Sequence, residues 1–124
     1  NKLPDEPQTL CLLAENYLHK YDYDMTNRIL KRVISLYPRF SWANRVMGNL
    51  CLKMNNRDEA FIYFGKAIKF ANDNKDISYV YFDIARFFIS EDKKEAIEYL
   101  KKAIEMQPES ELYNNLLKQL SSEN

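Results

Sequence analysis

Three kinds of side chain in this 124-residue sequence could carry chemistry: one histidine, two cysteines and a pair of neighbouring acids. His19 and Cys11 are the residue types of a base and its nucleophile. The eight positions that separate them span about 12 Å of helix, which is beyond hydrogen-bond reach. Asp22 and Asp24 could begin a metal site, but further ligands are missing at suitable spacing. We therefore expect no enzymatic activity, no metal and no cofactor.

The composition narrows the class of partner. Eighteen basic and eighteen acidic residues leave no net charge, so no overall field attracts a polyanion or an anionic membrane. Nucleic acid is therefore disfavoured, and no apolar run reaches the roughly 20 residues that cross a bilayer, so we expect no membrane insertion. The first residues lack the apolar stretch of a secretion signal, and the chain starts without methionine, as a segment of a longer protein would. Cys11 and Cys51 lie in apolar segments, which predicts two buried free thiols and a reducing compartment, cytoplasm or nucleus.

The elements that must position these side chains are helices. The only glycines are Gly48 and Gly65, and apolar residues recur three and four positions apart between the breakers, which is the helical period. Asp22, Asn56 and Asp92 have the residue types of helix N-caps. Prolines after the second and sixth helical stretches stop them. We predict helices at about 8–20, 25–37, 41–54, 57–72, 78–89, 93–106 and 110–120.

Two of these helices carry the same internal pattern. Ala60, Phe64, Ala67 and Ile68 return 36 positions later as Ala96, Leu100, Ala103 and Ile104. The alanines and the large residue between them share one stripe of their helix. Facing the small residue Gly48, this stripe allows two helices to approach closely. A repeat of this length is typical of stacked helical units that expose an extended surface and no enclosed pocket.

These residues resemble the tetratricopeptide repeat, a helix-turn-helix unit. Residues 41–74 carry Met47, Gly48, Ala60, Phe64 and Ala67 at preferred positions. Residues 7–40 and 78–110 follow the same register, and residues 110–120 are similar to the capping helix of such arrays. The resemblance implies an all-α, right-handed α-solenoid of three repeats plus a capping helix, as a single domain over residues 1–124. Asn72 replaces a proline of the pattern and residues 75–77 are extra, so we expect a long fourth helix or a bulged loop there.

The resemblance also implies a binding surface, because the first helix of each repeat in this family lines a concave groove for peptides or partner helices. The matching positions are a mixture of aromatic, charged and amide side chains: Glu15, His19, Trp42, Arg45, Asn49, Lys53, Tyr79, Phe82 and Arg86. Aromatic residues beside arginines are typical of interaction hot spots. The alternative is that Trp42, Tyr79 and Phe82 fill the seams between repeats. We expect a non-catalytic interaction module that acts as an adaptor, scaffold or chaperone.

Other functions of similar repeats stay open. Some members bind chaperone tails through a carboxylate clamp, of which only Arg45 and Asn49 are visible here, and Asp83 would repel a carboxylate. An RNA-binding helical repeat is a second alternative, although the charge balance does not favour it. Self-association of copies through their end helices into a structural array is a third.

Overall fold

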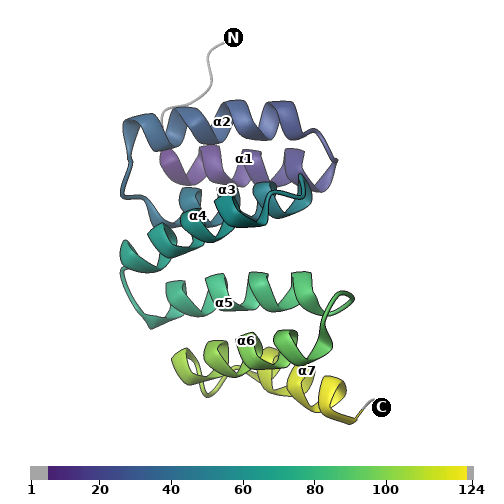
Figure 1. The fold of residues 1–124 in the computed structure, drawn as a ribbon. Helices are drawn as coiled ribbons and strands as arrows, with labels where there is room; N and C mark the ends of the chain where they lie inside the picture. The colour runs from purple at the N-terminus through teal and green to yellow at the C-terminus, as the bar shows by residue number, and fades with distance from the viewer. Residues whose placement is uncertain (1–5, 123–124) are drawn as a thin grey trace. The chain divides into compact units, whose positions relative to one another are not determined.

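The computed structural model describes residues 6–122 and contains, within them, seven α-helices and no strand. Residues 1–5, on which the prediction about a secretion signal rests, and residues 123–124 lie outside the described part. The helices are α1 (Pro7–His19), α2 (Tyr23–Leu36), α3 (Ser41–Lys53), α4 (Arg57–Lys69), α5 (Asn74–Phe88), α6 (Lys93–Met106) and α7 (Glu111–Ser122) (Figure 1). They form two compact units that divide between residues 71 and 72. We call them the amino-terminal unit (α1 to α4) and the carboxy-terminal unit (α5 to α7).

The predicted N-caps begin three of these helices. Side-chain oxygens of Asp22, Asn56 and Asp92 accept hydrogen bonds from backbone amides three residues later, at 3.1, 3.4 and 3.2 Å. Each bond satisfies one of the amides that a helix start leaves without an intrahelical partner. The N-cap predictions at α2, α4 and α6 are therefore confirmed.

The junction between the two units differs from the sequence prediction. Helix α4 ends at Lys69 and does not run long, and α5 begins at Asn74, ahead of the predicted start at 78. Asp73 caps α5 because its Oδ1 accepts a hydrogen bond from the amide of Asp76 at 2.9 Å. The three extra residues therefore lie in the first turn of α5, and the expected bulged loop is wrong.

The amino-terminal unit is built from two helical hairpins. Helix α1 packs on α2, and α3 on α4, while α3 also contacts α1 and α2. Phe64 of α4 is 1% exposed, and a β carbon placed on Gly48 of α3 would lie only 2.5 Å from its Cε1 atom. Ala60 and Ala67, on either side of Phe64 along the stripe, are fully buried. The close approach predicted for this stripe is therefore confirmed.

The turns that close these two hairpins share one backbone geometry. Tyr21 and Asn55 both have φ of 64° and are the described non-glycine residues with positive φ. The amide after each donates to the carbonyl five residues earlier, from Asp22 to Tyr17 at 2.9 Å and from Asn56 to Cys51 at 2.8 Å. Asparagine tolerates this left-handed region, whereas tyrosine is rare in it. Tyr21 is 75% exposed, so packing does not explain why a tyrosine occupies this position.

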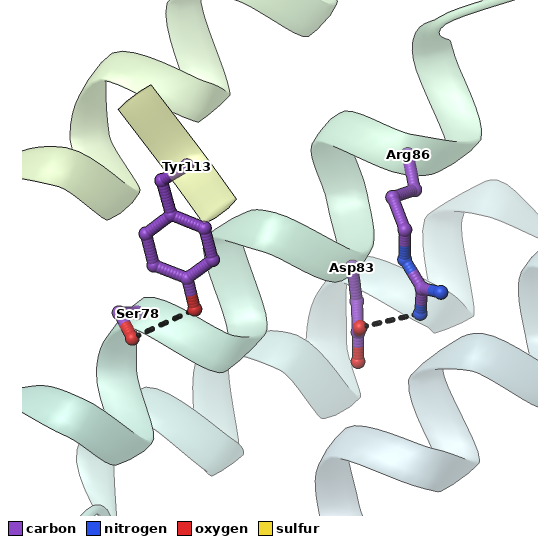
Figure 2. Close-up of polar contacts among 4 residues, drawn as sticks. All are labelled: Ser78, Asp83, Arg86 and Tyr113. Atoms are coloured by element: carbon purple, nitrogen blue, oxygen red, sulfur yellow. Dashed lines mark hydrogen bonds and ion pairs between the residues drawn. The ribbon is translucent and has the colours of Figure 1, made fainter. Parts of the chain in front are cut away.

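The carboxy-terminal unit has its own core. Ala85 of α5, Leu100 and Ala103 of α6, and Tyr113 and Leu120 of α7 form one buried cluster. The Tyr113 hydroxyl lies 3.1 Å from Ser78 Oγ (Figure 2). Ser78 Oγ also accepts a hydrogen bond from Gln107 Nε2 at 3.0 Å. The Tyr113 bond joins α7 to α5, and the Gln107 bond joins the end of α6 to the same fully buried serine.

Helix α7 is joined to α6 as α3 is joined to α2. Asn44 Nδ2 donates to the carbonyls of Pro38 and Phe40 at 3.4 and 2.9 Å. Asn114 Nδ2 donates in the same way to Pro108 and Ser110 at 2.9 and 2.8 Å. Helix α7 therefore has the local geometry of the first helix of a repeat.

Candidate functional site

On the amino-terminal unit, α1 and α3 bring predicted groove residues to one face. Burial raises the pKa of the Cys11 thiol to about 12, the carboxylate of Glu15 adds to the rise, and the guanidinium of Arg45 opposes it. These electrostatic effects require Glu15 and Arg45 each to lie near Cys11. Both are half-buried, so one negative and one positive group lie near a buried thiol.

Trp42 is the aromatic residue of this face. Its side chain is half-buried, and its ring centroid lies 6.4 Å from that of Phe40. The indole Nε1 atom is buried and has no hydrogen-bond acceptor among residues 6–122. A buried donor of this kind destabilises the folded state by about 1–3 kcal/mol. Asn49 is half-buried, and His19 and Lys53 are exposed at the last residues of α1 and α3.

On the carboxy-terminal unit, α5 carries the predicted groove residues Tyr79, Phe82 and Arg86. The Phe82 ring packs against Tyr113 of α7 with centroids 4.9 Å apart. The Arg86 guanidinium lies over the ring of Phe82, 5.1 Å from its centroid. Arg86 Nη2 also donates to Asp83 Oδ1 at 2.8 Å (Figure 2). The three side chains Phe82, Asp83 and Arg86 therefore form one connected cluster.

The nine predicted groove residues all keep part of their surface exposed. His19, Lys53 and Arg86 are exposed, and the others are half-buried: Glu15, Trp42, Arg45, Asn49, Tyr79 and Phe82. Part of the Phe82 ring packs against Tyr113 of α7. This residue therefore also fills a contact between helices, which was the alternative stated for the aromatic residues. The role of these nine residues in binding stays a prediction.

Two residues of this region have roles that the sequence argument missed. Asp83 was expected to face a ligand and repel carboxylates, but its side chain is only 4% exposed and is paired with Arg86. The spacing of three residues was the available signal, since such pairs are neighbours on a helix. Tyr113, 35 positions from Ser78, gave no local signal, because the bond depends on how α7 packs.

The two cysteines have thiols of low reactivity. Cys11 and Cys51 are both buried free thiols, as predicted, and burial raises the pKa of each. A thiol with a raised pKa stays protonated at neutral pH and is a poor nucleophile.

Within residues 6–122 no three His, Cys, Asp or Glu side chains are grouped as metal ligands. In the same range no helix has the length and apolar character of a membrane span.

Comparisons with known proteins agree with the repeat architecture. A family model for the tetratricopeptide repeat matches residues 46–74 and 78–110, which together make up half of the chain. The second match has the bounds of the predicted third repeat, and the first lies within the predicted second repeat. No curated protein matches the chain.

A solved structure of a MamA RS-1 ArsTM double mutant is similar in fold. Its TM-score is 0.62 at 19% sequence identity, and the alignment covers 96% of this chain and 66% of that one. This chain thus spans just under two thirds of that protein's length. At this identity the likeness extends to the fold, an all-α helical repeat. Together with the family match over half of its length, these findings show that the chain belongs to the tetratricopeptide repeat family.

Proposed function

We propose that this chain is a non-catalytic adaptor or scaffold that binds a peptide or a partner helix on its first helices. Tetratricopeptide repeats are in general protein–protein interaction modules. The observation that carries the proposal is the exposure of the nine residues described above, on helices whose opposite sides are buried. Large side chains that stay partly exposed in a folded domain can bury further area against a partner.

The α1 and α3 face supports contact with a polypeptide. Trp42 supplies a large ring whose N–H has no acceptor within residues 6–122, so a partner carbonyl that meets a reoriented indole would satisfy this donor. Glu15 and Arg45 add one charge of each sign. Mixed charges around an aromatic anchor favour selection by shape and hydrogen bonding over attraction by a single-signed field.

A selection from random dodecapeptides displayed on phage tests this proposal. Peptides that bind the chain are synthesised, and their affinities are measured by fluorescence anisotropy. The double variant Trp42→Ala with Arg45→Ala should weaken binding at least about thirtyfold, because truncating one hot-spot residue costs about 2 kcal/mol.

The matched control replaces Arg28 and Lys31, two exposed cations of α2, by alanine. It should leave the affinity unchanged, and circular dichroism should show native helix content for both double variants. Equal affinity of the Trp42 and Arg45 variant and the wild type would contradict the proposal, as would a selection that enriches no binding peptide.

A further inference from the structure

The charges of this chain cancel in total but are unevenly distributed along it. Residues 25–72 contain nine lysines and arginines against two acids, which leaves nine against sixteen in the rest of the chain. Almost all of this basic range belongs to the amino-terminal unit. The expectation against nucleic acid rests on the net charge of the whole chain, whereas screening in salt limits the reach of a charge to about 10 Å. A local excess of cations can therefore attract an anion although the total is zero.

Helix α2 carries part of this excess on one face. Its exposed residues follow the helical period, so they lie on the side opposite the buried apolar residues of the helix. These exposed residues are Asp24, Arg28, Lys31, Arg32, Ser35 and Leu36. Three of them are cations, and the one acid lies in the first turn. From Arg28 to Leu36 the face extends about 12 Å, over which a stacked strand of nucleic acid has about three or four phosphates.

The connection that follows α2 adds an aromatic ring and a further cation. Tyr37 is 40% exposed, and Arg39 is exposed as well. The amide of Phe40 donates to the Tyr37 carbonyl at 3.1 Å, and the side-chain bonds of Asn44 hold the same turn. Tyr37 and Arg39 therefore extend from a backbone of fixed geometry, which reduces the entropy lost when a ligand binds.

Helix α6 has the same local structure with different charges. Its bounds, Lys93–Met106, lie 70 positions after those of α2, Tyr23–Leu36. Its following turn is closed in the same way, by a bond from the amide of Ser110 to the Gln107 carbonyl at 3.2 Å. The exposed residues at the positions of the four cations are Glu98, Lys101, Lys102 and Glu109, and Gln107 replaces the tyrosine. The fold therefore does not require the cations and the aromatic ring at α2.

The chemistry of this face favours one kind of anion. Single-stranded nucleic acid combines phosphates, which pair with lysine and arginine, with bases that stack on aromatic rings. A helix that binds an anionic membrane inserts its apolar face, but the apolar face of α2 is buried within the protein. Leu36, which is 48% exposed, is the one exposed aliphatic residue of this helix. A membrane therefore fits the face less well than a nucleic acid strand.

We propose that this chain binds single-stranded nucleic acid on the α2 face, which we define as Arg28, Lys31, Arg32, Tyr37 and Arg39. The four cations pair with phosphates of the strand, and the Tyr37 ring stacks on a base. None of the nine predicted groove residues lies on α2 or on the connection that follows it. The inference thus goes beyond the proposed function and does not depend on it.

Two labelled strands test the inference by fluorescence anisotropy with the full chain. The first has twelve thymidine nucleotides, and its binding should weaken with salt. The slope of log K against log salt should be about −3, since each of four cations contributes about −0.7 on a single strand. The second has twelve abasic nucleotides and should bind at least about fivefold more weakly, because it has no base to stack on Tyr37. Equal binding of the two strands, or binding of neither at low salt, would overturn the inference.

Variants of matched charge locate the effect. Arg28→Glu with Arg39→Glu gives the α2 face the acids that α6 has at these two positions, and it should abolish binding of the thymidine strand. The control, Lys101→Glu with Lys118→Glu, changes the net charge equally at exposed residues of the carboxy-terminal unit and should retain binding. Equal losses in the two double variants, with native helix content in circular dichroism, would show general attraction and overturn the inference. Tyr37→Ala should remove the difference between the thymidine and abasic strands.

Two further comparisons separate the inference from its alternatives. Sedimentation with phosphatidylserine vesicles, without binding of the thymidine strand, would assign the α2 face to a membrane and overturn the inference. Trp42→Ala should weaken peptide binding under the proposed function and leave binding of the thymidine strand unchanged. A loss of strand binding in this variant would place the nucleic acid on the groove residues and contradict the α2 site. Each of the two proposals can therefore fail while the other stands.

Discussion

Tyr21 has a backbone conformation that its own side chain disfavours. Its φ of 64° brings the β carbon close to the following carbonyl, which destabilises an ordinary L-residue by about 1–2 kcal/mol. Asparagine is better tolerated there, and Asn55 has the same φ in the equivalent turn. The change Tyr21→Asn should therefore keep the turn and relieve the strain.

The magnitude follows from the exposure of the ring. Because Tyr21 is 75% exposed, it keeps about a quarter of the burial that would stabilise a fully buried large side chain by about 1.5–3 kcal/mol. Losing that burial costs about 0.5 kcal/mol, against about 1 kcal/mol of strain relieved. Tyr21→Asn should raise the free energy of unfolding by about 0.5 kcal/mol. The reverse change, Asn55→Tyr, should lower it by about 0.5 kcal/mol, because the strain and burial contributions both change sign.

Urea unfolding followed by circular dichroism measures these differences. Both turns belong to the amino-terminal unit, so the two variants are compared on the same structure. Tyr21→Phe retains the β carbon and the ring and should leave stability unchanged. A loss of more than about 1 kcal/mol in Tyr21→Asn, or no loss in Asn55→Tyr, would refute the strain argument.

Two further predictions concern packing and pH. Gly48→Ala should lower the free energy of unfolding by about 1–3 kcal/mol, since its β carbon would lie 2.5 Å from Phe64 Cε1. Gly65→Ala should raise the free energy of unfolding by about 0.5–1 kcal/mol, because nothing lies within 4 Å of the new β carbon. If urea unfolding gave similar effects for the two glycine variants, the packing argument would be contradicted. Burial raises the pKa of Cys11 from 9.0 to about 12, so its contribution to stability is complete below pH 9.0 and is lost as pH rises toward 12. Cys11→Ala should flatten the decline of stability in that window, and an unchanged pH profile would count against the burial of this thiol.

Local chemistry explains why most of the fold was predictable. Asp22, Asn56 and Asp92 begin their helices as their residue types require, and the alanine stripe faces Gly48 as its spacing requires. Helix α5 begins earlier than predicted because Asp73, which also has the residue type of an N-cap, caps it. The φ of Tyr21 could not be predicted, since tyrosine has no preference for that region and the hairpin geometry imposes it.

The candidate site was predictable only in part. Helical periodicity decides which side of a helix is exposed, so the repeat register was sufficient to select nine residues that keep exposed surface. The register selected Arg86 as an exposed residue, but it does not predict that Arg86 forms an ion pair with the buried Asp83. The support of Phe82 by Tyr113 depends on the packing of α5 against α7, which no local pattern encodes. The single-domain span and the binding roles stay predictions.

The paired side-chain hydrogen bonds of Asn44 and Asn114 have a consequence for engineering. Each holds a proline-containing connection closed through two carbonyls that belong to the connection itself. These bonds fix the bend within each connection, whereas the helix residues that follow contact distant parts of the chain: Ser41 Oγ donates to the Ala67 carbonyl at 2.7 Å, and the Tyr113 hydroxyl lies 3.1 Å from Ser78 Oγ. An exchange confined to Arg39 and Glu109, which are both exposed, should therefore keep both bends intact.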